Sequence, residues 1–211
     1  MTAAAAGEKA PGAPRETRTL LVVTGSLSAA FVPQGVGHLR MTHPGIRIRT
    51  LVTRSALKFV TATAVAAATG GEVTLDAWED DRPGTPAEAL HVELAEWAER
   101  IVVYPASWHY VARLAQGLAD VPSLLALHTS RAEVAVAPSV PPGSLDSKVF
   151  QRHLAELRDR GYRVAPVLLA RSTGGTRPAL VPPPMPDVMA LFDQAPPAPS
   201  PPAPAGRQAA P

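Results

Sequence analysis

His91 and several small hydroxyl residues are the side chains of this sequence whose type and position favour chemistry. His91 opens the segment 91–97, HVELAEW, in which apolar residues recur at spacings of two to three with acids between them, as in a short amphipathic helix. An imidazole with an ordinary pKa of about 6.5 can accept or donate a proton near neutral pH. Isolated histidines are more often structural, so a chemical role for His91 requires a binding site beside the start of this helix.

The turn 24–28, TGSLS, is a candidate phosphate site. It follows the apolar run 19–23 and opens a helix, whose first N–H groups have no partner within the helix and can bind an anion. Gly25 allows close approach of the backbone, and Ser26 and Ser28 add hydroxyl donors. An ordinary strand-to-helix turn with a serine cap explains the same residues. The turn lacks the pattern Gly-Xaa-Gly-Xaa-Xaa-Gly, which argues against a dinucleotide fingerprint.

Thr53 and Ser55 form a second group of hydroxyl residues at the end of an apolar run. They come directly after the run 46–52, which is predicted to be a strand. Their hydroxyls can therefore face a ligand at the carboxyl end of that strand. Capping of the following helix by Ser55 explains the sequence equally well, and both roles can hold at once.

The run 101–104, IVVY, predicts a further strand with small residues at its end. It has no polar interruption, which suits a strand buried on both faces of a parallel sheet. Pro105 has no N–H and is predicted to end that strand, while Ala106 and Ser107 leave room beyond it. Ligands of open α/β sheets bind in the crevice outside the carboxyl ends of the strands, so this turn predicts a site.

Strand-like and helix-like segments alternate along the chain. This alternation predicts a parallel sheet with right-handed crossovers, and hence a single α/β domain with a doubly wound, Rossmann-like sheet and helices on both faces. The predicted strands are 19–23, 46–52, 72–77, 101–104, 132–137 and 162–169. The predicted helices follow the turn 25–30 and cover 56–68 (ended by Gly70 and Gly71), 91–97, 111–118 and 147–160, the last with Val149, Leu154 and Leu157 facing inward.

The two ends of the sequence have no apolar periodicity. Residues 1–17 are rich in Ala, Gly and Pro and are predicted to be a disordered arm. Residues 194–211 are a Pro-rich tail that favours extended conformations and is also predicted to be disordered. The folded domain is therefore predicted to cover 18–193. The loops 80–86 and 170–178 are predicted to lie on its surface, the second of them mobile.

Composition excludes several classes of protein. The 211 residues carry a net charge of +2 with scattered basic residues, so we predict no nucleic-acid partner. The chain has no cysteine, which excludes disulfides, thiolate metal ligands and a cysteine nucleophile, and we predict no metal site. No apolar run approaches the roughly 18 residues of a membrane span, and the N-terminus lacks a signal-peptide pattern. A cytoplasmic protein that does not contact a membrane is the expectation.

The stretch 91–120, HVELAEWAERIVVYPASWHYVARLAQGLAD, resembles the central motif of the homo-oligomeric flavin-containing cysteine decarboxylases. This family includes the phosphopantothenoylcysteine decarboxylases and the peptidyl-cysteine decarboxylases of lantibiotic biosynthesis. Its motif is a histidine opening a short helix, a strand, Pro-Ala-Ser/Thr-Ala-Asn-Thr, and a helix ending in Gly-Xaa-Ala-Asp. The matching residues here are His91, the turn 105–107 and residues 117–120, and the resemblance extends over residues 18–186.

The resemblance implies a bound flavin, with FMN as the default and FAD left open. In the family the Gly-Ser turn binds the flavin phosphate, the Thr-Xaa-Ser/Ala segment approaches the flavin, and the Pro-Ala-Ser/Thr turn faces its ring. The family's acid/base histidine corresponds to His91, and its sites lie between the subunits of a trimer, often with four trimers in a dodecamer. The residues thereby assigned to cofactor binding are Gly25, Ser26, Ser28, Thr53, Ser55, Pro105, Ala106 and Ser107.

The residues expected to bind the substrate depart from the family pattern. Trp108-His109-Tyr110 replaces Ala-Asn-Thr, so the resemblance implies that His109 takes over the substrate carboxylate from the asparagine, as a donor or as a cation. Trp108 and Tyr110 can stack on a ring or pack in the core. Arg171 or Arg177 can clamp a peptide carboxylate, with surface solvation as the alternative.

Two absences direct the functional prediction. The segment 138–146 lacks the Met and Asn of the family's Pro-Xaa-Met-Asn motif, and 170–178 lacks the cysteine with which coenzyme A pathway relatives return electrons from reduced flavin. We therefore predict flavin-dependent oxidative decarboxylation of the C-terminal cysteine of a ribosomal precursor peptide, giving an aminoenethiol for an S-aminovinyl-cysteine ring. The alternatives are a phosphopantothenoylcysteine decarboxylase, a flavin prenyltransferase of the same fold, and a non-catalytic binding or regulatory subunit.

Overall fold

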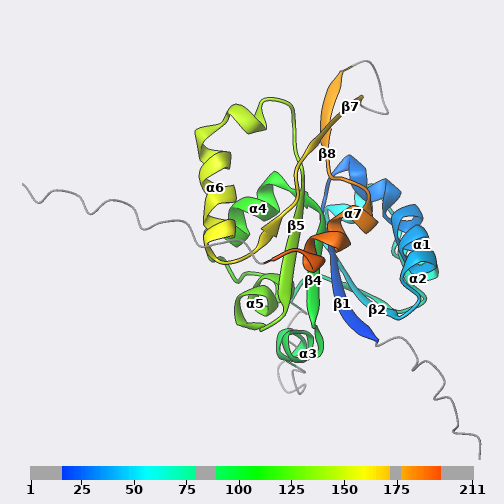
Figure 1. Ribbon diagram of the computed structural model, residues 1–211. Coiled ribbons are helices and arrows are strands. Elements are labelled where there is room, and N and C mark those ends of the chain that lie inside the picture. The colour runs from blue at the N-terminus through cyan, green and yellow to red at the C-terminus, as the bar shows by residue number, and fades with distance from the viewer. Residues whose placement is uncertain (1–15, 79–88, 172–176, 196–211) are drawn as a thin grey trace, which may run out of the picture.

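A six-stranded parallel sheet forms the centre of the protein (Figure 1). The computed structural model describes residues 16–78, 89–171 and 177–195. The strand order is β3-β2-β1-β4-β5-β6, with parallel pairing throughout. The strands are β1 (Thr17–Val23), β2 (Ile46–Val52), β3 (Val73–Leu75), β4 (Arg100–Ser107), β5 (Glu133–Ser139) and β6 (Arg163–Val164).

Helices cover both faces of the sheet (Figure 1), which confirms the predicted doubly wound α/β fold. One face carries α1 (Val32–Thr42), α2 (Ala62–Thr69) and α7 (Met185–Met189). The other carries α3 (Leu90–Trp97), α4 (Trp108–Ala115), α5 (Pro122–Thr129) and α6 (Lys148–Asp159). The short 3-10 helices are η1 (Leu27–Phe31), η2 (Ala56–Lys58), η3 (Ser144–Asp146) and η4 (Ala190–Asp193).

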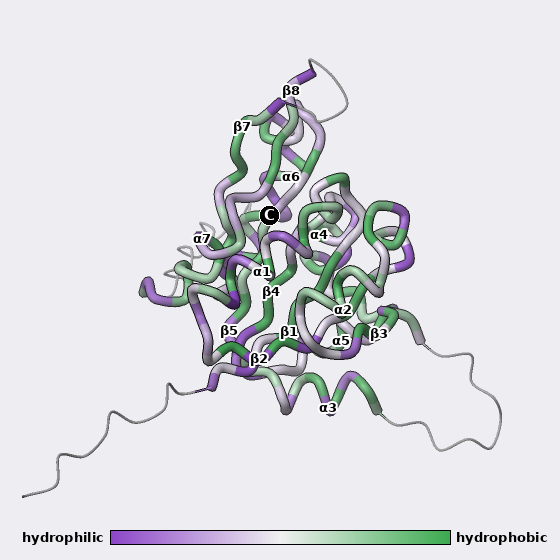
Figure 2. The backbone as a smooth tube through the Cα atoms, turned by 90° about the vertical axis from the view of Figure 1, so that its right-hand side faces the viewer, coloured by the Kyte–Doolittle hydropathy of each residue, from purple (hydrophilic) through white to green (hydrophobic). Residues whose placement is uncertain are grey.

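The central strands are apolar throughout because they face two cores. Successive side chains of a strand point to opposite faces of the sheet. In β1, Leu20 and Val22 pack with α4, α5 and α6, whereas Leu21 and Val23 pack with α1 and α7. The run 101–104 of β4 is buried on both faces for the same reason. Figure 2 shows the resulting hydrophobic stretches along β1 and β4.

The direction in which strands are added reverses between β1 and β4. From β1 the chain proceeds outward to β2 and β3, and it then returns to the other side of β1 for β4, β5 and β6. The connections on the two sides of this point leave the sheet on opposite faces, so a crevice opens at the carboxyl ends of β1 and β4. The fold thereby brings the turn 24–28 and the turn 105–107 to one edge of the sheet.

The prediction of one last strand at 162–169 is wrong. The structure has β6 in the main sheet and a separate antiparallel hairpin of β7 (Leu168–Arg171) and β8 (Pro178–Val181). Pro166 lies between β6 and β7 and has no N–H for a strand ladder. Val140 N donates to Leu180 O at 3.1 Å and joins the hairpin to the segment after β5. Figures 1 and 2 show the hairpin beyond the carboxyl ends of the strands, at the end of the molecule opposite α3.

The prediction that Pro105 ends its strand is also wrong. β4 continues to Ser107 and pairs again with β5 through Ala106 and Ser107. The pairing register shifts between Val103 and Ala106, so an irregularity in the ladder accommodates the missing N–H of Pro105. The Tyr104–Pro105 peptide bond is cis.

Two helix predictions need correction as well. The segment 56–68 is not one helix, because η2 ends at Lys58 and α2 begins anew after Thr61, whose hydroxyl accepts from Ala64 N at 3.1 Å. Gly70 ends α2 as predicted, with a left-handed φ of 70°. In α6 the predicted inward residue Val149 is 54% exposed, and its neighbour in sequence Phe150 is buried instead.

Several predicted segments lie outside the described residues. They are the arm 1–17 up to residue 15, the loop 80–86, residues 172–176 of the segment 170–178, and the tail from residue 196. Thr17, at the end of the predicted arm, already belongs to β1. Across the parts of the chain that the structure describes, none of the helices has the length and apolar character needed to cross a membrane.

Candidate flavin site

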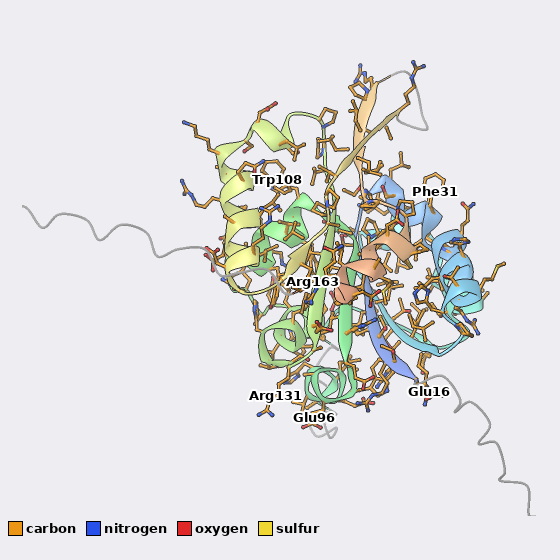
Figure 3. The ribbon with its side chains drawn as sticks, viewed as in Figure 1. Glu16, Phe31, Glu96, Trp108, Arg131 and Arg163 are labelled. Carbon is orange, nitrogen blue, oxygen red and sulfur yellow. The ribbon has the colours of Figure 1, made fainter. Side chains whose placement is uncertain are left out.

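A cavity of about 970 Å³ opens at the carboxyl ends of the strands. Residues 24–28 and 53–55 form the part of its wall that we call the β1–β2 end. Residues 107–110, 139–142 and 177–181 form the part that we call the α4–β8 end. Two lining residues, Phe31 on the α1 side and Trp108 on the α6 side, are labelled in Figure 3 and mark its extent across the sheet.

Most residues predicted for the site line this one cavity. Pro105 and Ala106 are exceptions, since they are buried in β4 behind the wall. His91 is the other exception and does not line the cavity of its own chain. The residues that the structure does bring together are Gly25, Ser26, Ser28, Thr53, Ser55, Ser107, Trp108, His109 and Arg171.

Thr24 holds the ends of β1 and β4 together, and the sequence prediction did not assign it a role. Its hydroxyl donates to Pro105 O at 2.6 Å and accepts from Ser107 N at 2.8 Å. Its own N–H donates to Pro105 O at 3.3 Å. A buried hydroxyl that bridges two strand ends fixes the turn 24–28 relative to Ser107. The signal in the sequence is a threonine directly after a buried strand.

Gly25 lies against the segment after β2 so closely that only glycine fits. A Cβ atom at this position would lie 2.4 Å from Ser55 Oγ and 2.5 Å from Ser55 Cβ. The φ angle of Gly25 is not in the left-handed region, so space rather than backbone conformation excludes a side chain. The two turns of the β1–β2 end therefore form one packed unit.

The hydroxyl groups of this unit differ in how they are satisfied. Ser28 Oγ and Ser139 Oγ, which both line the cavity, form a hydrogen bond of 2.9 Å. Thr53 Oγ1 accepts from Ala56 N at 3.2 Å and bonds Ser55 Oγ at 3.0 Å, so Thr53 rather than Ser55 caps the following turn. Ser26 Oγ is buried, and no group of the described residues bonds it. A buried hydroxyl without a protein partner, beside backbone N–H groups, fits an anionic ligand such as a phosphate.

Ser107 and Trp108 begin the α4–β8 end of the cavity. Ser107 caps α4, with its Oγ accepting from Tyr110 N at 3.3 Å, and its hydroxyl hydrogen is left for a ligand. Trp108 stacks on Phe150 of α6, with ring centroids 4.6 Å apart. Trp108 therefore packs in the protein and also lines the cavity. His109 is exposed and lines the cavity.

Tyr110 belongs to a buried polar network that the sequence did not predict. Its hydroxyl lies 2.6 Å from Ser123 Oγ, which donates to Asp76 Oδ2 at 2.6 Å, and Ser123 N donates to Asp76 Oδ1 at 2.9 Å. Burial raises the pKa of the Asp76 carboxyl, and the hydrogen bonds from Ser123 oppose that rise. Burial likewise raises the pKa of Tyr110 well above its ordinary value. Asp76 and Tyr110 both line the cavity.

Arg113 is a second cavity residue that the prediction missed. Its Nε lies 3.1 Å from Asp120 Oδ1 in a hydrogen-bonded ion pair, and its charge opposes the rise that burial causes in the pKa of Asp76. The signal in the sequence is the spacing of four residues between His109 and Arg113, which places both on one face of α4. The signal for Asp76 is an acid at the carboxyl end of a predicted strand.

His91 lies at the start of α3, away from the hairpin end of the molecule (Figure 2). Its ring packs edge-on against Trp78, with centroids 5.5 Å apart. Its Nδ1 is buried and has no hydrogen-bond partner in the described part of the chain. Trp78 and Val92 beside it are 45% and 42% exposed. The exposed apolar side chains of Trp78 and Val92 beside His91 form a surface that another molecule could cover.

The sequence matches the family described as Flavoprotein over residues 8–184. The cypemycin cysteine dehydrogenase (decarboxylating) of a Streptomyces species is 36% identical over 119 residues, which are 56% of this chain and 61% of that protein. The coenzyme A biosynthesis bifunctional protein CoaBC of Vibrio vulnificus (strain YJ016) is 31% identical over 157 residues, 74% of this chain and 38% of that protein. These matches span less than two thirds of each relative's own length.

Two solved structures match over more of their own lengths than these relatives do. The FMN-dependent cysteine decarboxylase SpaF superposes with a TM-score of 0.68 at 28% identity, covering 84% of this chain and 96% of that one. The cypemycin decarboxylase CypD superposes with a TM-score of 0.61 at 31% identity, covering 71% of this chain and 82% of that one. With the cavity at the carboxyl ends of a doubly wound sheet, these matches define the class: the chain belongs to the flavoprotein family.

Proposed function

We propose that the protein is an FMN-dependent oxidative decarboxylase that acts on the C-terminal cysteine of a peptide. Removal of two electrons and two protons from the cysteine CH2–SH group gives a thioaldehyde, and loss of carbon dioxide then leaves the electron pair of the broken C–C bond in an enethiolate. When bound, FMN supplies the acceptor for the two electrons. The similarity to the cypemycin enzyme and to SpaF supports this reaction class.

The observation that carries the proposal is the β1–β2 end of the cavity. Ser26 Oγ is buried there without a protein partner, and Gly25 keeps the adjoining backbone free of a side chain. These groups would hold the FMN phosphate, with the Thr53 and Ser55 hydroxyls in the same wall. Ser107 would donate its remaining hydroxyl hydrogen to the flavin at the end of β4.

His91 is proposed to manage protons at the cavity of a neighbouring subunit. It lies outside its own chain's cavity, its Nδ1 has no partner among the described residues, and Trp78 and Val92 expose apolar surface beside it. A homo-oligomer, either a trimer or four trimers in a dodecamer, would cover that surface and bring His91 to the partner's ligand. The imidazole would then accept or return a proton at that ligand.

The peptide is proposed to bind at the α4–β8 end. His109 is exposed in the cavity and can donate a hydrogen bond to the terminal carboxylate of the peptide. Arg171, on the β7 strand of the hairpin, lines the same space and offers a cation. Val140 and Pro141 occupy the wall where the family motif has Met and Asn, so the carboxylate contacts have to come from these other side chains.

The test is a mass assay on the FMN-loaded protein with a peptide that ends in cysteine. The proposed reaction removes about 46 mass units, two hydrogens plus carbon dioxide, from the peptide. His91→Asn keeps a planar polar side chain but not its acid/base chemistry, so this variant should lose the reaction and keep FMN affinity. An unchanged peptide mass with FMN bound would refute the reaction, and a fully active His91→Asn variant would refute the role of His91.

A phosphopantothenoylcysteine decarboxylase is the second candidate, because the matched relatives include a coenzyme A biosynthesis protein. That reaction ends with a loss of about 44 mass units, carbon dioxide alone, since its electrons return to the product. The absence of cysteine in this chain argues against it. Incubation with phosphopantothenoylcysteine in place of the peptide distinguishes the two substrates directly.

A further inference from the structure

The network of Asp76, Ser123 and Tyr110 joins three elements at the cavity. Asp76 follows β3, Ser123 lies in the first turn of α5, and Tyr110 lies in the first turn of α4. All three are almost completely buried, at 3%, 0% and 2% exposure, yet Asp76 and Tyr110 line the cavity. Neither residue has a part in the chemistry proposed above.

With Asp76 ionised, counting hydrogens gives the order of donors and acceptors in this network. Both oxygens of an ionised Asp76 accept from Ser123, one from its N–H and one from its O–H. Ser123 has a single hydroxyl hydrogen, which is used on Asp76. Tyr110 must therefore donate its own O–H to Ser123 Oγ. The lone pairs of the Tyr110 oxygen remain, and no N–H of the described residues donates to them.

We propose that Tyr110 binds an N–H group of the ligand through its phenol oxygen, and that Asp76 and Ser123 are positioning residues that keep this oxygen an acceptor. The inference rests on the proposed function, because the two ligand N–H groups it concerns are the imide of the flavin ring and the amide of the peptide. Hydrogen-bond acceptors fixed in a buried wall select donors strongly, since an unpaired buried group is costly.

The same network has a structural role that does not depend on a ligand. The Asp76 carboxylate accepts from the N-terminus of α5, where the helix dipole favours an anion. Tyr162 provides the comparison, because its hydroxyl donates to Leu127 O of the same helix at 3.1 Å but does not line the cavity. If the role of Tyr110 were purely structural, Tyr110→Phe and Tyr162→Phe would have the same effect on the FMN Kd and on the peptide KM.

The experiment compares Tyr110→Phe, Tyr162→Phe and Asp76→Asn in the full chain. FMN affinity is measured by quenching of flavin fluorescence, and peptide KM and kcat by the mass assay. Tyr110→Phe should raise either the FMN Kd or the peptide KM by about fivefold, the effect of one neutral hydrogen bond. A raised FMN Kd identifies the flavin imide as the donor, and a raised peptide KM identifies the peptide amide. Tyr162→Phe should change neither.

Asp76→Asn tests the positioning step. The Asn amide donates to Ser123 Oγ, so the Ser123 O–H turns to Tyr110 and the tyrosine hydrogen points into the cavity. This reversal should raise the same Kd or KM as Tyr110→Phe does. The double variant Asp76→Asn with Tyr110→Phe should bind the ligand no more weakly than Tyr110→Phe alone. If Asp76→Asn does not fold, Ser123→Ala tests the same positioning step, because it removes the hydroxyl that bonds both Asp76 and Tyr110.

The outcomes separate this inference from the proposed function. If the wild-type protein binds FMN and converts the peptide while Tyr110→Phe matches it in Kd and KM, the acceptor role is refuted and the proposed function stands. Additive effects of Asp76→Asn and Tyr110→Phe would refute the positioning role alone. If the wild-type protein neither binds FMN nor converts the peptide, the proposed function fails, and this inference fails with it.

Discussion

The two ends of the cavity are built on different principles. The β1–β2 end consists of backbone and small hydroxyl side chains, with Gly25 packed on Ser55 and Ser26 left without a protein partner. The α4–β8 end consists of large side chains that are already engaged, with Trp108 stacked on Phe150 and Tyr110 bonded to Ser123. The backbone and small side chains of the β1–β2 end suit a ligand group that never varies. The large side chains of the α4–β8 end can be exchanged to fit a particular substrate.

The largest effect is expected from adding one carbon atom at the β1–β2 end. Gly25→Ala places a Cβ 2.4 Å from Ser55 Oγ, so the turns after β1 and β2 must separate. Overpacking of this severity lies near the upper limit of about 3 kcal/mol, and we expect an FMN Kd raised by about a hundredfold. Fluorescence titration measures the Kd.

Gly37→Ala is the matched control for this change. A Cβ at Gly37, in α1, meets nothing within 4 Å. This variant should bind FMN like the wild-type protein, and it should be slightly more stable, because alanine favours a helix over glycine by about 1 kcal/mol. Wild-type FMN affinity in Gly25→Ala would show that the β1–β2 end does not hold the cofactor.

A smaller effect is expected from removing the unpartnered hydroxyl at the same end. Ser26 Oγ is buried without a protein partner among the described residues, so Ser26→Ala should not lower the free energy of unfolding of the FMN-free protein. One hydrogen bond to a charged phosphate contributes about 1.5 kcal/mol, so the FMN Kd should rise by about tenfold.

Riboflavin is the control ligand for Ser26→Ala, since it has the ring of FMN without the phosphate. Its Kd should be the same in the variant and in the wild-type protein. An equal loss of affinity for FMN and riboflavin would mean that Ser26 contacts the ring and that the phosphate lies elsewhere. Calorimetric titration of both ligands gives the comparison.

The difference between the two ends also explains what could be predicted from the sequence. The turn 24–28 and the pair Thr53 and Ser55 are local: each follows a strand directly, so the alternation of strands and helices alone places them at one edge of the sheet. The doubly wound fold was predicted for the same reason, because buried strands are marked by continuous apolar runs.

The α4–β8 end depends on contacts that no local pattern encodes. The bond from Ser123 to Asp76 joins residues 47 positions apart, and the Val140–Leu180 pairing depends on a hairpin that apolar runs did not separate from β6. Two predictions at prolines were wrong. Pro105 was predicted to end a strand but lies within β4, and a strand was predicted across Pro166, which lies between β6 and β7. The ladder around each proline, rather than the residue itself, decides whether a strand continues.

The smallest effect is expected from the charge buried at the α4–β8 end. Burial raises the pKa of Asp76 above its ordinary value of 3.8, so folding favours the protonated carboxyl. A raised pKa gives a contribution to stability that is complete below the unfolded pKa and is lost as the pH rises through the folded pKa. The wild-type protein should therefore lose this contribution between acidic and neutral pH, whereas Asp76→Asn has no carboxyl to titrate.

Thermal unfolding at about pH 3.5 and about pH 7 measures this effect. The Tm of Asp76→Asn minus that of the wild-type protein should become more positive on going to neutral pH, by about 2–4 °C for each 1 kcal/mol of lost stabilisation. A difference that becomes more negative would mean that the carboxylate stabilises the fold. Asp76 would then stabilise the N-terminus of α5, and this part of the α4–β8 end would contribute to the stability of the fold as well as to ligand binding.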